Sequence, residues 1–315
     1  MTESRSERKN SNKKRKWLYW VGGILITILI IGGGYLWYVW DKLHDTVEDM
    51  HNPLARDEDP ERQEEIKGIF NDKKSLNVLL LGVDEREGDK GRSDTMILMS
   101  LNPNTDSMKM LSIPRDTYVI IPGHGMDKIN HSYAFGGVEL SIQTVEEAFD
   151  VPVHFYGKVN MEGFEQGVDS LGGVTITNNM EFTQDGVYFP TGEIHLNGEE
   201  ALSYIRMRKN DPRGDMGRNE RQREVITAAI DEAASFTSIT KVGEILGILG
   251  NNVNTDLNMD NIQNLFTNYL GTRANVETME ISGSGQIIGG TWYYIVPDTE
   301  FNRITNEITA HMEAN

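Results

Sequence analysis

The chain has 315 residues, enough to bury one or two hydrophobic cores, and carries a net charge of −18 from 30 basic and 48 acidic side chains. It contains no cysteine, which excludes disulfides, thiolate nucleophiles and zinc–thiolate sites. Its seven histidines are scattered and include no HExxH pair, so a histidine-based metal site is not expected.

The first forty residues predict a membrane anchor. Residues 1–16 are basic, and residues 17–40 are almost wholly apolar and free of charge, with tryptophans and tyrosines at both ends. At about 1.5 Å per residue, a helix over this run crosses a bilayer core of about 30 Å. A cleaved signal peptide is the alternative, but the apolar run is too long and no A-x-A site follows it.

Positive charge ahead of the apolar run sets the expected orientation. The basic tail stays in the cytoplasm and everything after Trp40 lies outside, as in a single-pass type II protein of the cell membrane. The tail holds seven cations and two acids, so the remaining chain has 23 cations against 46 acids, a net charge of −23. Such an acidic surface does not attract nucleic acid, and no nucleic-acid partner is expected.

Residues 41–74 are polar and rich in charge, and they predict a stalk that lifts the following domain off the membrane. The second half of this segment contains the helical-looking run ERQEEIKGIF. That half is also consistent with the first helix of the folded domain.

Residues 75–315 predict a single extracellular α/β domain with a central mixed β-sheet flanked by helices. Apolar runs of strand length occur at 76–84, 95–102, 108–114, 118–123, 153–160, 174–177, 276–282 and 292–297. Helical patterns occur at 136–149, 161–173, 196–205, 219–234, 244–249, 259–270 and from 298 onward. The first run is apolar throughout, which suits a strand covered on both faces. The glycine-rich segment 282–290 lacks the spacing of a phosphate loop and is expected to be a surface loop.

Residues 204–224 concentrate cations in this acidic chain: Arg206, Arg208, Lys209, Arg213, Arg218, Arg221 and Arg223. Arg206 and Arg208 are two apart, so an extended segment points both to one face. A helix is expected to begin near Asn219, with Arg218, Arg221 and Gln222 in or beside its first turn.

Cations in a first helical turn oppose the helix dipole, at a cost of about 0.3–1 kcal/mol each. A bound anion between the arginines and the free amides of the helix start compensates for this, and phosphate fits best. The alternative is a solvated helix with salt bridges to Asp211, Asp215, Glu220 and Glu224.

Charged residues also follow two predicted strands. Asp84, Arg92 and Asp94 lie around the end of the first strand, and Arg115 and Asp116 come directly after Pro114. Ligand sites of open α/β sheets lie at such strand ends. Two carboxylates without His or Cys suit a hard cation such as Mg²⁺ shared with phosphate oxygens. Turn or cap roles are the alternative for each aspartate taken alone.

Over about residues 76–235 the chain resembles the LytR-CpsA-Psr family of cell-envelope proteins, through GVDEREGDKGRSDTMIL, LSIPRDTYV, KINHSYAFGG, ALSYIRMRK and DPRGDMGRNERQRE. The resemblance implies an extracytoplasmic phosphotransferase of a Gram-positive type of envelope. Such an enzyme takes a glycopolymer, most commonly wall teichoic acid, from a polyprenyl-pyrophosphate carrier. It joins the polymer to peptidoglycan through a phosphodiester.

The resemblance also assigns roles to residues. Asp84 and Asp94 would hold Mg²⁺, or alternatively Mn²⁺, on the pyrophosphate, and the lipid would occupy an apolar tunnel between sheet and helices. The implied pyrophosphate-binding residues are Arg92, Arg115, Arg206, Arg208, Asp215, Arg218, Arg221 and Gln222, with Asp215 orienting arginines of that set. The implied catalytic residues are Asp94, Arg115, Asp116 and Arg208, with Asp94 or Asp116 as the hypothetical base.

Two other functions remain open from the sequence. A hydrolase of polyprenyl-pyrophosphate glycans would use the same pocket with water as the acceptor. A non-catalytic protein that binds lipid carriers or regulates envelope genes would not need a metal-binding aspartate pair. Regulation through DNA binding is disfavoured because the folded part is external and acidic.

Overall fold

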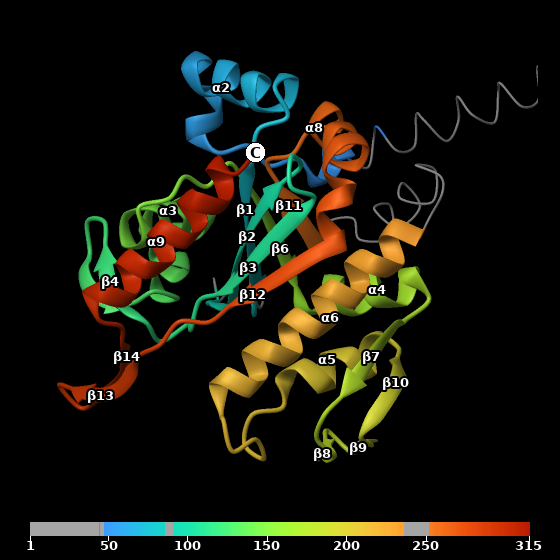
Figure 1. The fold of residues 1–315 in the computed structure, drawn as a ribbon. Coiled ribbons are helices and arrows are strands. Elements are labelled where there is room, and N and C mark those ends of the chain that lie inside the picture. Colours follow the sequence, from blue (N-terminus) through green and yellow to red (C-terminus); the bar gives the residue numbers. More distant parts are fainter. Residues whose placement is uncertain (1–43, 45–46, 86–90, 236–251) are drawn as a thin grey trace, which may run out of the picture.

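The computed structural model describes residues 44, 47–85, 91–235 and 252–315 (Figure 1). The predicted membrane anchor and the helix predicted at 244–249 lie outside the described residues. Within the described ranges, no helix is both long and apolar enough to cross a membrane. Anchoring and orientation therefore stay predictions.

A six-stranded mixed sheet forms the centre of the domain (Figure 1), which confirms the predicted α/β class. Its strand order is β11-β6-β1-β2-β3-β12, with bounds Val253–Thr255, Phe155–Asn160, Leu76–Val83, Ser93–Asn102, Ser107–Ser112 and Asn275–Met279. The hairpin predicted for β2 and β3 is present, and β1 pairs antiparallel with β2 and parallel with β6. The central position of β1 explains why its sequence is apolar except for Asn77, since both of its faces are covered.

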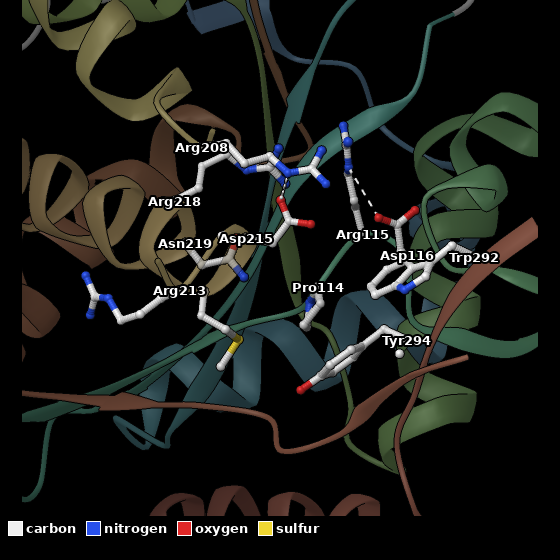
Figure 2. A pocket seen from close by; sticks show the side chains of 13 residues that line it. Pro114, Arg115, Asp116, Arg208, Arg213, Asp215, Arg218, Asn219, Trp292 and Tyr294 are labelled. Carbon is white, nitrogen blue, oxygen red and sulfur yellow. Dashed lines mark ion pairs between the residues drawn. The ribbon is translucent and has the colours of Figure 1, made fainter. Parts of the chain in front are cut away.

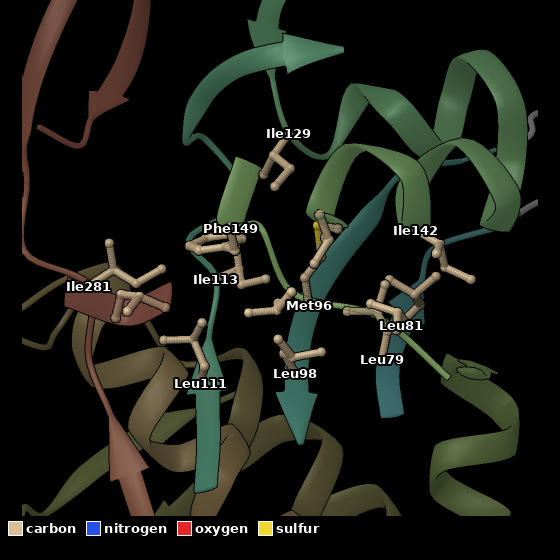
Figure 3. Close-up of a cluster of buried hydrophobic side chains, with 14 of the residues drawn as sticks. Leu79, Leu81, Met96, Leu98, Leu111, Ile113, Ile129, Ile142, Phe149 and Ile281 are labelled. Carbon is tan, nitrogen blue, oxygen red and sulfur yellow. The ribbon is translucent and has the colours of Figure 1, made fainter. Parts of the chain in front are cut away.

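Helices α3 (His131–Phe149) and α9 (Asp298–Glu313) cover one face of the sheet (Figure 1). The large core lies between these helices and the sheet, and Figure 3 shows part of it, including Leu79, Leu81, Met96, Leu98, Leu111, Ile142 and Phe149. Ile304 of α9 is buried in the same core. The sequence predicted α3 from Gly136 onward. The structure begins it at His131 and kinks it at Gly136 and Gly137, where Gly137 has a positive φ of 67°.

Helix α6 (Asp215–Ser235) covers the other face, where Ile226 and Ile230 pack against Ile97, Met99 and Met110. It begins four residues before the predicted start at Asn219. Asp215 stands in its first turn, where a carboxylate is favourable beside the positive end of the helix.

A second, smaller core lies beside α6. It is built by α4, β7, β8, β9, β10 and α5, with bounds Met161–Leu171, Val174–Asn178, Phe182–Gln184, Val187–Phe189, Gly192–Leu196 and Gly198–Arg206. Arg206 is the last residue of α5, so the extended conformation predicted for it is wrong. The chain becomes extended only at Met207, the residue after the helix.

Short elements complete the domain. Near the N-terminal side lie η1 (Ala55–Glu58) and α2 (Pro60–Asn71), whose Ile69 and Phe70 pack with Phe155. This packing matches the alternative that the second half of the predicted stalk is a helix of the domain. Other short elements are α8, η3, η4, β4 and β5, with bounds Met259–Asn264, Leu265–Tyr269, Leu270–Ala274, Tyr118–Ile121 and Gly125–Lys128.

The segment predicted as a surface loop is instead half of a hairpin. Strand β13 (Ser284–Ile288) pairs with β14 (Thr291–Ile295), and the two extend from the domain as an arm (Figure 1). Gly289 and Gly290 have φ values of 57° and 84°. Two successive positive φ angles form the tight turn that matches the twist of a hairpin, and glycine adopts them without strain.

Candidate functional site

A pocket of about 400 Å³, here called the basic pocket, collects residues that are far apart in the sequence (Figure 2). The loop after β3 supplies Arg115 and Asp116, the segment after α5 supplies Arg208, and the start of α6 supplies Asp215 and Arg218. Three arginines predicted to bind pyrophosphate therefore meet at one place. The remaining lining residues are Pro114, Arg213, Gly214, Met216, Asn219, Gly285, Trp292 and Tyr294.

Asp215 pairs with two of these arginines. Its Oδ1 lies 3.0 Å from Nε of Arg208 and 3.1 Å from Nη2 of Arg218. One carboxylate oxygen thus pairs by charge with two guanidinium groups, and their other nitrogens can reach a ligand. This arrangement agrees with the expectation that Asp215 orients arginines.

Arg218 is the most desolvated of these arginines, at 9% exposed. Burial lowers its pKa below the ordinary value, and the neighbouring Arg115 adds to the lowering against partial compensation by Asp215. Its Nε is buried without a hydrogen-bond partner. A buried cation with an unpartnered donor is costly unless an anion completes the site, so the geometry fits an anionic ligand.

Arg115 is tied on both sides. Its Nη1 donates to Oδ1 of Asp94 at 2.7 Å, and its Nε lies 3.7 Å from Asp116, which also accepts from Nζ of Lys128 at 2.6 Å. Burial alone lowers the pKa of Arg115, but Asp94 and Asp116 outweigh it and raise the pKa above its ordinary value. Arg115 is therefore a fixed, permanently charged group.

A second cavity of about 560 Å³ adjoins the basic pocket and is called the apolar chamber. It lies between the sheet and the helices, with apolar walls from Leu80, Leu81, Val159, Met161, Phe164, Ile205, Ile226 and Val253. Its polar residues are Asp84, Asp94, Thr95, Lys158, Asn160, Arg206, Arg218 and Gln222. Among the described residues that line the two cavities, Arg218 alone is common to both.

The chamber has the position expected for an apolar tunnel between sheet and helices. Asp94 lines the chamber while its partner Arg115 lines the basic pocket. The Arg115–Asp94 pair and Arg218 therefore separate an apolar compartment from a charged one. An amphiphile with a phosphate head suits such a pair of compartments.

The predicted metal residues Asp84 and Asp94 both line the chamber, at neighbouring ends of β1 and β2. No group of three or more His, Cys, Asp or Glu side chains that could hold a metal ion occurs in the described part of the chain. Two carboxylates fit Mg²⁺ when substrate phosphate oxygens and water complete its shell, which is the usual way proteins bind this ion.

Not every predicted residue reaches the cavities. Arg92 is exposed and lines neither cavity. Arg221 is buried, donates to Asp211 Oδ2 at 2.8 Å and to the Met207 carbonyl at 2.7 Å, and lies over the Phe182 ring. Its contacts give it a supporting role for the segment between α5 and α6, so the salt-bridge alternative describes it better than ligand binding does.

Several residues of the two cavities or their support were not predicted from the sequence. Lys128 holds Asp116, Lys158 lines the chamber, and Trp292 with Tyr294 lines the basic pocket. The Gly289–Gly290 pair just before the strand-like run at 292–297 was the available signal for the hairpin that carries Trp292 and Tyr294. Nothing in the sequence places either lysine.

Together, the mixed sheet, the cluster of arginines and the adjoining apolar chamber define an α/β protein built to hold an amphiphilic phosphate compound. The chain belongs to the LytR_cpsA_psr family, whose model matches residues 37–310. This confirms the resemblance found in the motifs.

Relatives agree along almost the whole chain. A polyisoprenyl-teichoic acid–peptidoglycan teichoic acid transferase, TagU, of Oceanobacillus iheyensis is 59% identical over 316 residues, covering 98% of this chain and 99% of the relative. The TagU protein of Bacillus cereus is 47% identical over 302 residues, covering 95% and 99%.

Solved structures show the same fold. TagU of Bacillus subtilis has a TM-score of 0.63 at 44% identity, covering 77% of this chain and 98% of that one. TagT bound to LIIa-WTA has a TM-score of 0.71 at 35% identity, covering 84% and 100%.

Proposed function

We propose that this protein is a phosphotransferase that moves a glycopolymer, wall teichoic acid, from a polyprenyl-pyrophosphate carrier to peptidoglycan. The observation that carries the proposal is the junction of the apolar chamber with the basic pocket at Arg218. The family and the names of its TagU relatives support the same donor and acceptor.

The two compartments divide the donor in a simple way. The polyprenyl chain occupies the apolar chamber, and the pyrophosphate lies against Arg115, Arg208 and Arg218 at its charged end. Burial of apolar chain contributes about 0.8 kcal/mol per methylene, while guanidinium forks bind phosphate oxygens through two bonds at once. The site thereby recognises both halves of a lipid pyrophosphate.

In the reaction, a sugar hydroxyl of peptidoglycan attacks the phosphorus that carries the polymer. A new P–O bond forms to the glycan, the bond to the bridging oxygen breaks, and polyprenyl phosphate leaves with that oxygen. Negative charge accumulates on the equatorial and leaving oxygens, and fixed arginines stabilise it without having to reorganise. The chain has no cysteine, and direct attack needs no covalent intermediate.

A divalent cation at Asp84 and Asp94 would add Lewis-acid stabilisation of phosphoryl charge. Asp94 and Asp116 remain the candidate acceptors of the hydroxyl proton. Both carboxylates are held in place by cations, Asp94 by Arg115 and Asp116 by Lys128. A loose transition state asks little of a base, since the attacking hydroxyl keeps most of its proton until late.

The anchor proposed at residues 17–40 fits this chemistry, because a polyprenyl donor resides in the membrane. The domain would act on the outer side, where peptidoglycan lies.

The test uses the full chain in mixed micelles with a polyprenyl-pyrophosphate glycolipid and a peptidoglycan oligomer. We expect polymer joined covalently to glycan, with loss on chelation and recovery with Mg²⁺. Asp84→Asn should raise the Mg²⁺ concentration needed, and Asp72→Asn, at an exposed surface pair with Lys74, is the control. Released polymer without a glycan product would favour the hydrolase, and binding without turnover would favour a carrier-binding protein.

A further inference from the structure

The β13–β14 arm is fixed to the loop that carries Arg115. The backbone N–H of Tyr294 donates to the carbonyl of Asp116 at 2.8 Å, and the Tyr294 hydroxyl donates to the carbonyl of Ile281 at 2.9 Å. On the opposite face of the strand, the Tyr293 ring packs on Tyr118 at 4.6 Å between centroids. The base of the arm is therefore held from two sides.

Trp292 stands on the same face of β14 as Tyr294, because residues two apart in a strand point the same way. Both line the basic pocket (Figure 2), yet Trp292 is still 44% exposed. A Cβ at Gly285, on the paired strand, would lie 2.6 Å from Nε1 of Trp292. The absence of a side chain at Gly285 thus lets the indole lie against the strand backbone and keeps its ring at the pocket wall.

The geometry of in-line phosphoryl transfer indicates which substrate lies against Trp292 in the basic pocket. The attacking and leaving oxygens lie on opposite sides of the phosphorus. The leaving group belongs to the lipid, which occupies the chamber on one side of Arg218. The attacking hydroxyl must then arrive from the basic pocket on the other side. The polymer is an equatorial substituent of the same phosphorus and extends away from this line.

We infer that Trp292, with Tyr294, forms the platform on which a sugar ring of the peptidoglycan acceptor lies while its hydroxyl approaches the pyrophosphate. This inference rests on the proposed function. A pyranose ring presents apolar C–H groups on one face and hydroxyls at its edge, so an exposed indole beside a polar pocket matches both.

The first test varies the acceptor oligomer at saturating donor, and then the donor at saturating acceptor. Trp292→Ala should raise the acceptor KM by about tenfold, the loss expected for one aromatic contact of about 1.4 kcal/mol, with kcat and donor KM unchanged. Trp292→Phe should restore most of the acceptor affinity. Ile287→Ala is the matched control, because Ile287 is 69% exposed on the same arm and does not line the pocket.

A raised donor KM in Trp292→Ala would overturn the inference, because it would place a donor sugar on the platform. An unchanged acceptor KM in Trp292→Ala would overturn the inference as well.

The second test needs no turnover. The sequence has five tryptophans, and Trp292 is the single one after residue 40. The fluorescence difference between the wild-type chain and Trp292→Phe therefore reports Trp292 in the full chain. Adding acceptor oligomer without donor should change this difference signal, and adding donor alone should not.

The two tests distinguish failure of the platform inference from failure of the proposed transferase function. A Trp292 response to acceptor in a protein that transfers nothing would support the platform and refute the transferase. Transfer by a protein whose Trp292 signal ignores the acceptor would refute the platform and keep the transferase.

Discussion

A single oxygen of Asp215 lies within 3.1 Å of both Arg208 and Arg218. Asp215 stands in the first turn of α6, and Arg208 precedes that helix by a loop. The aspartate thus joins the loop to the helix at the wall of the basic pocket. Losing its charge should release two guanidinium groups at once.

Asp215→Asn should lower transfer by about 10- to 100-fold, the usual cost of removing a group that orients binding side chains. The free energy of unfolding should fall as well, because the buried Arg218 loses its paired carboxylate. Rates from single-turnover assays and urea midpoints check both statements. Asp231→Asn, which removes an exposed pair with Arg273, is the control. Equal activity in the two variants would contradict the role of Asp215.

Arg218→Lys keeps the charge at the junction of the two cavities but removes the planar fork. We expect kcat to fall by about 10²- to 10³-fold, as when a preorganised donor to a developing oxyanion is lost. Arg273→Lys is the matched exchange at an exposed site and should keep wild-type rates. Near-normal kcat in Arg218→Lys would mean that charge alone suffices there.

The missing side chain at Gly217 leaves space for the Asp211–Arg221 ion pair, which supports the segment between α5 and α6. A Cβ at this position would lie 1.7 Å from Oδ2 of Asp211, the atom that accepts from Arg221. Gly217→Ala should therefore cost about 1–3 kcal/mol of unfolding free energy through overpacking. Gly68→Ala, also within a helix but with open space around the new methyl, should stabilise by about 0.5–1 kcal/mol. Similar urea midpoints for both variants would refute this contrast.

Asp256 should make stability depend on pH. Burial, with a smaller contribution from Asp57, raises its pKa to about 7 against the coulombic influence of Arg56. Between about pH 4 and pH 7 the unfolded chain has lost this proton while the folded chain keeps it, so the contribution of Asp256 to stability falls as pH rises.

In the wild type the backbone N–H of Tyr156 donates to Oδ1 of Asp256 at 2.9 Å. Asp256→Asn removes the titrating group and keeps an oxygen that can accept this hydrogen bond. The unfolding free energy of Asp256→Asn minus that of the wild type should therefore grow from pH 4 to pH 7. Urea titrations at three pH values measure it, and the opposing titration of buried His154 cancels in the difference. A difference that stays constant with pH would show that Asp256 keeps its ordinary pKa.

Val159 lines the apolar chamber from β6. Val159→Phe should shorten the space available to a lipid, so kcat/KM for donors with full-length polyprenyl chains should fall by about tenfold or more. Donors with one or two isoprene units should react as before and serve as the internal control. An equal loss for short and long chains would indicate damage to the pyrophosphate site instead.

Strands β1, β2, β3, β6 and β12 of the central sheet could be predicted from their own sequence runs, whereas β11, with the three residues VNT, was not predicted. β1 needs burial on both faces, and its eight residues contain no charge. The β13 strand could not be predicted in this way, since SGQII is short, polar and mostly exposed. Pairing with β14 makes it a strand, and pairing is a property of the folded chain.

The candidate site, too, could be predicted from the sequence only in part. The arginine segment stood out by composition, yet Arg218 and Arg221 are only three residues apart and differ in role. Arg218 faces the cavities, whereas Arg221 turns to Asp211 and Met207. Which of two neighbouring arginines faces a ligand depends on the course of the loop before α6, and no local pattern encodes that course.

The separation of the two cavities at Arg218 also bears on how products depart. Under the proposed reaction, the spent carrier and the lengthened glycan are never in the same compartment. Polyprenyl phosphate can leave through the apolar chamber by which its chain entered. The glycan can leave from the basic pocket past Trp292 toward the cell wall. Each product can therefore leave independently of the other. If product release limits turnover, a substitution along the exit path of the slower product should be enough to raise the rate.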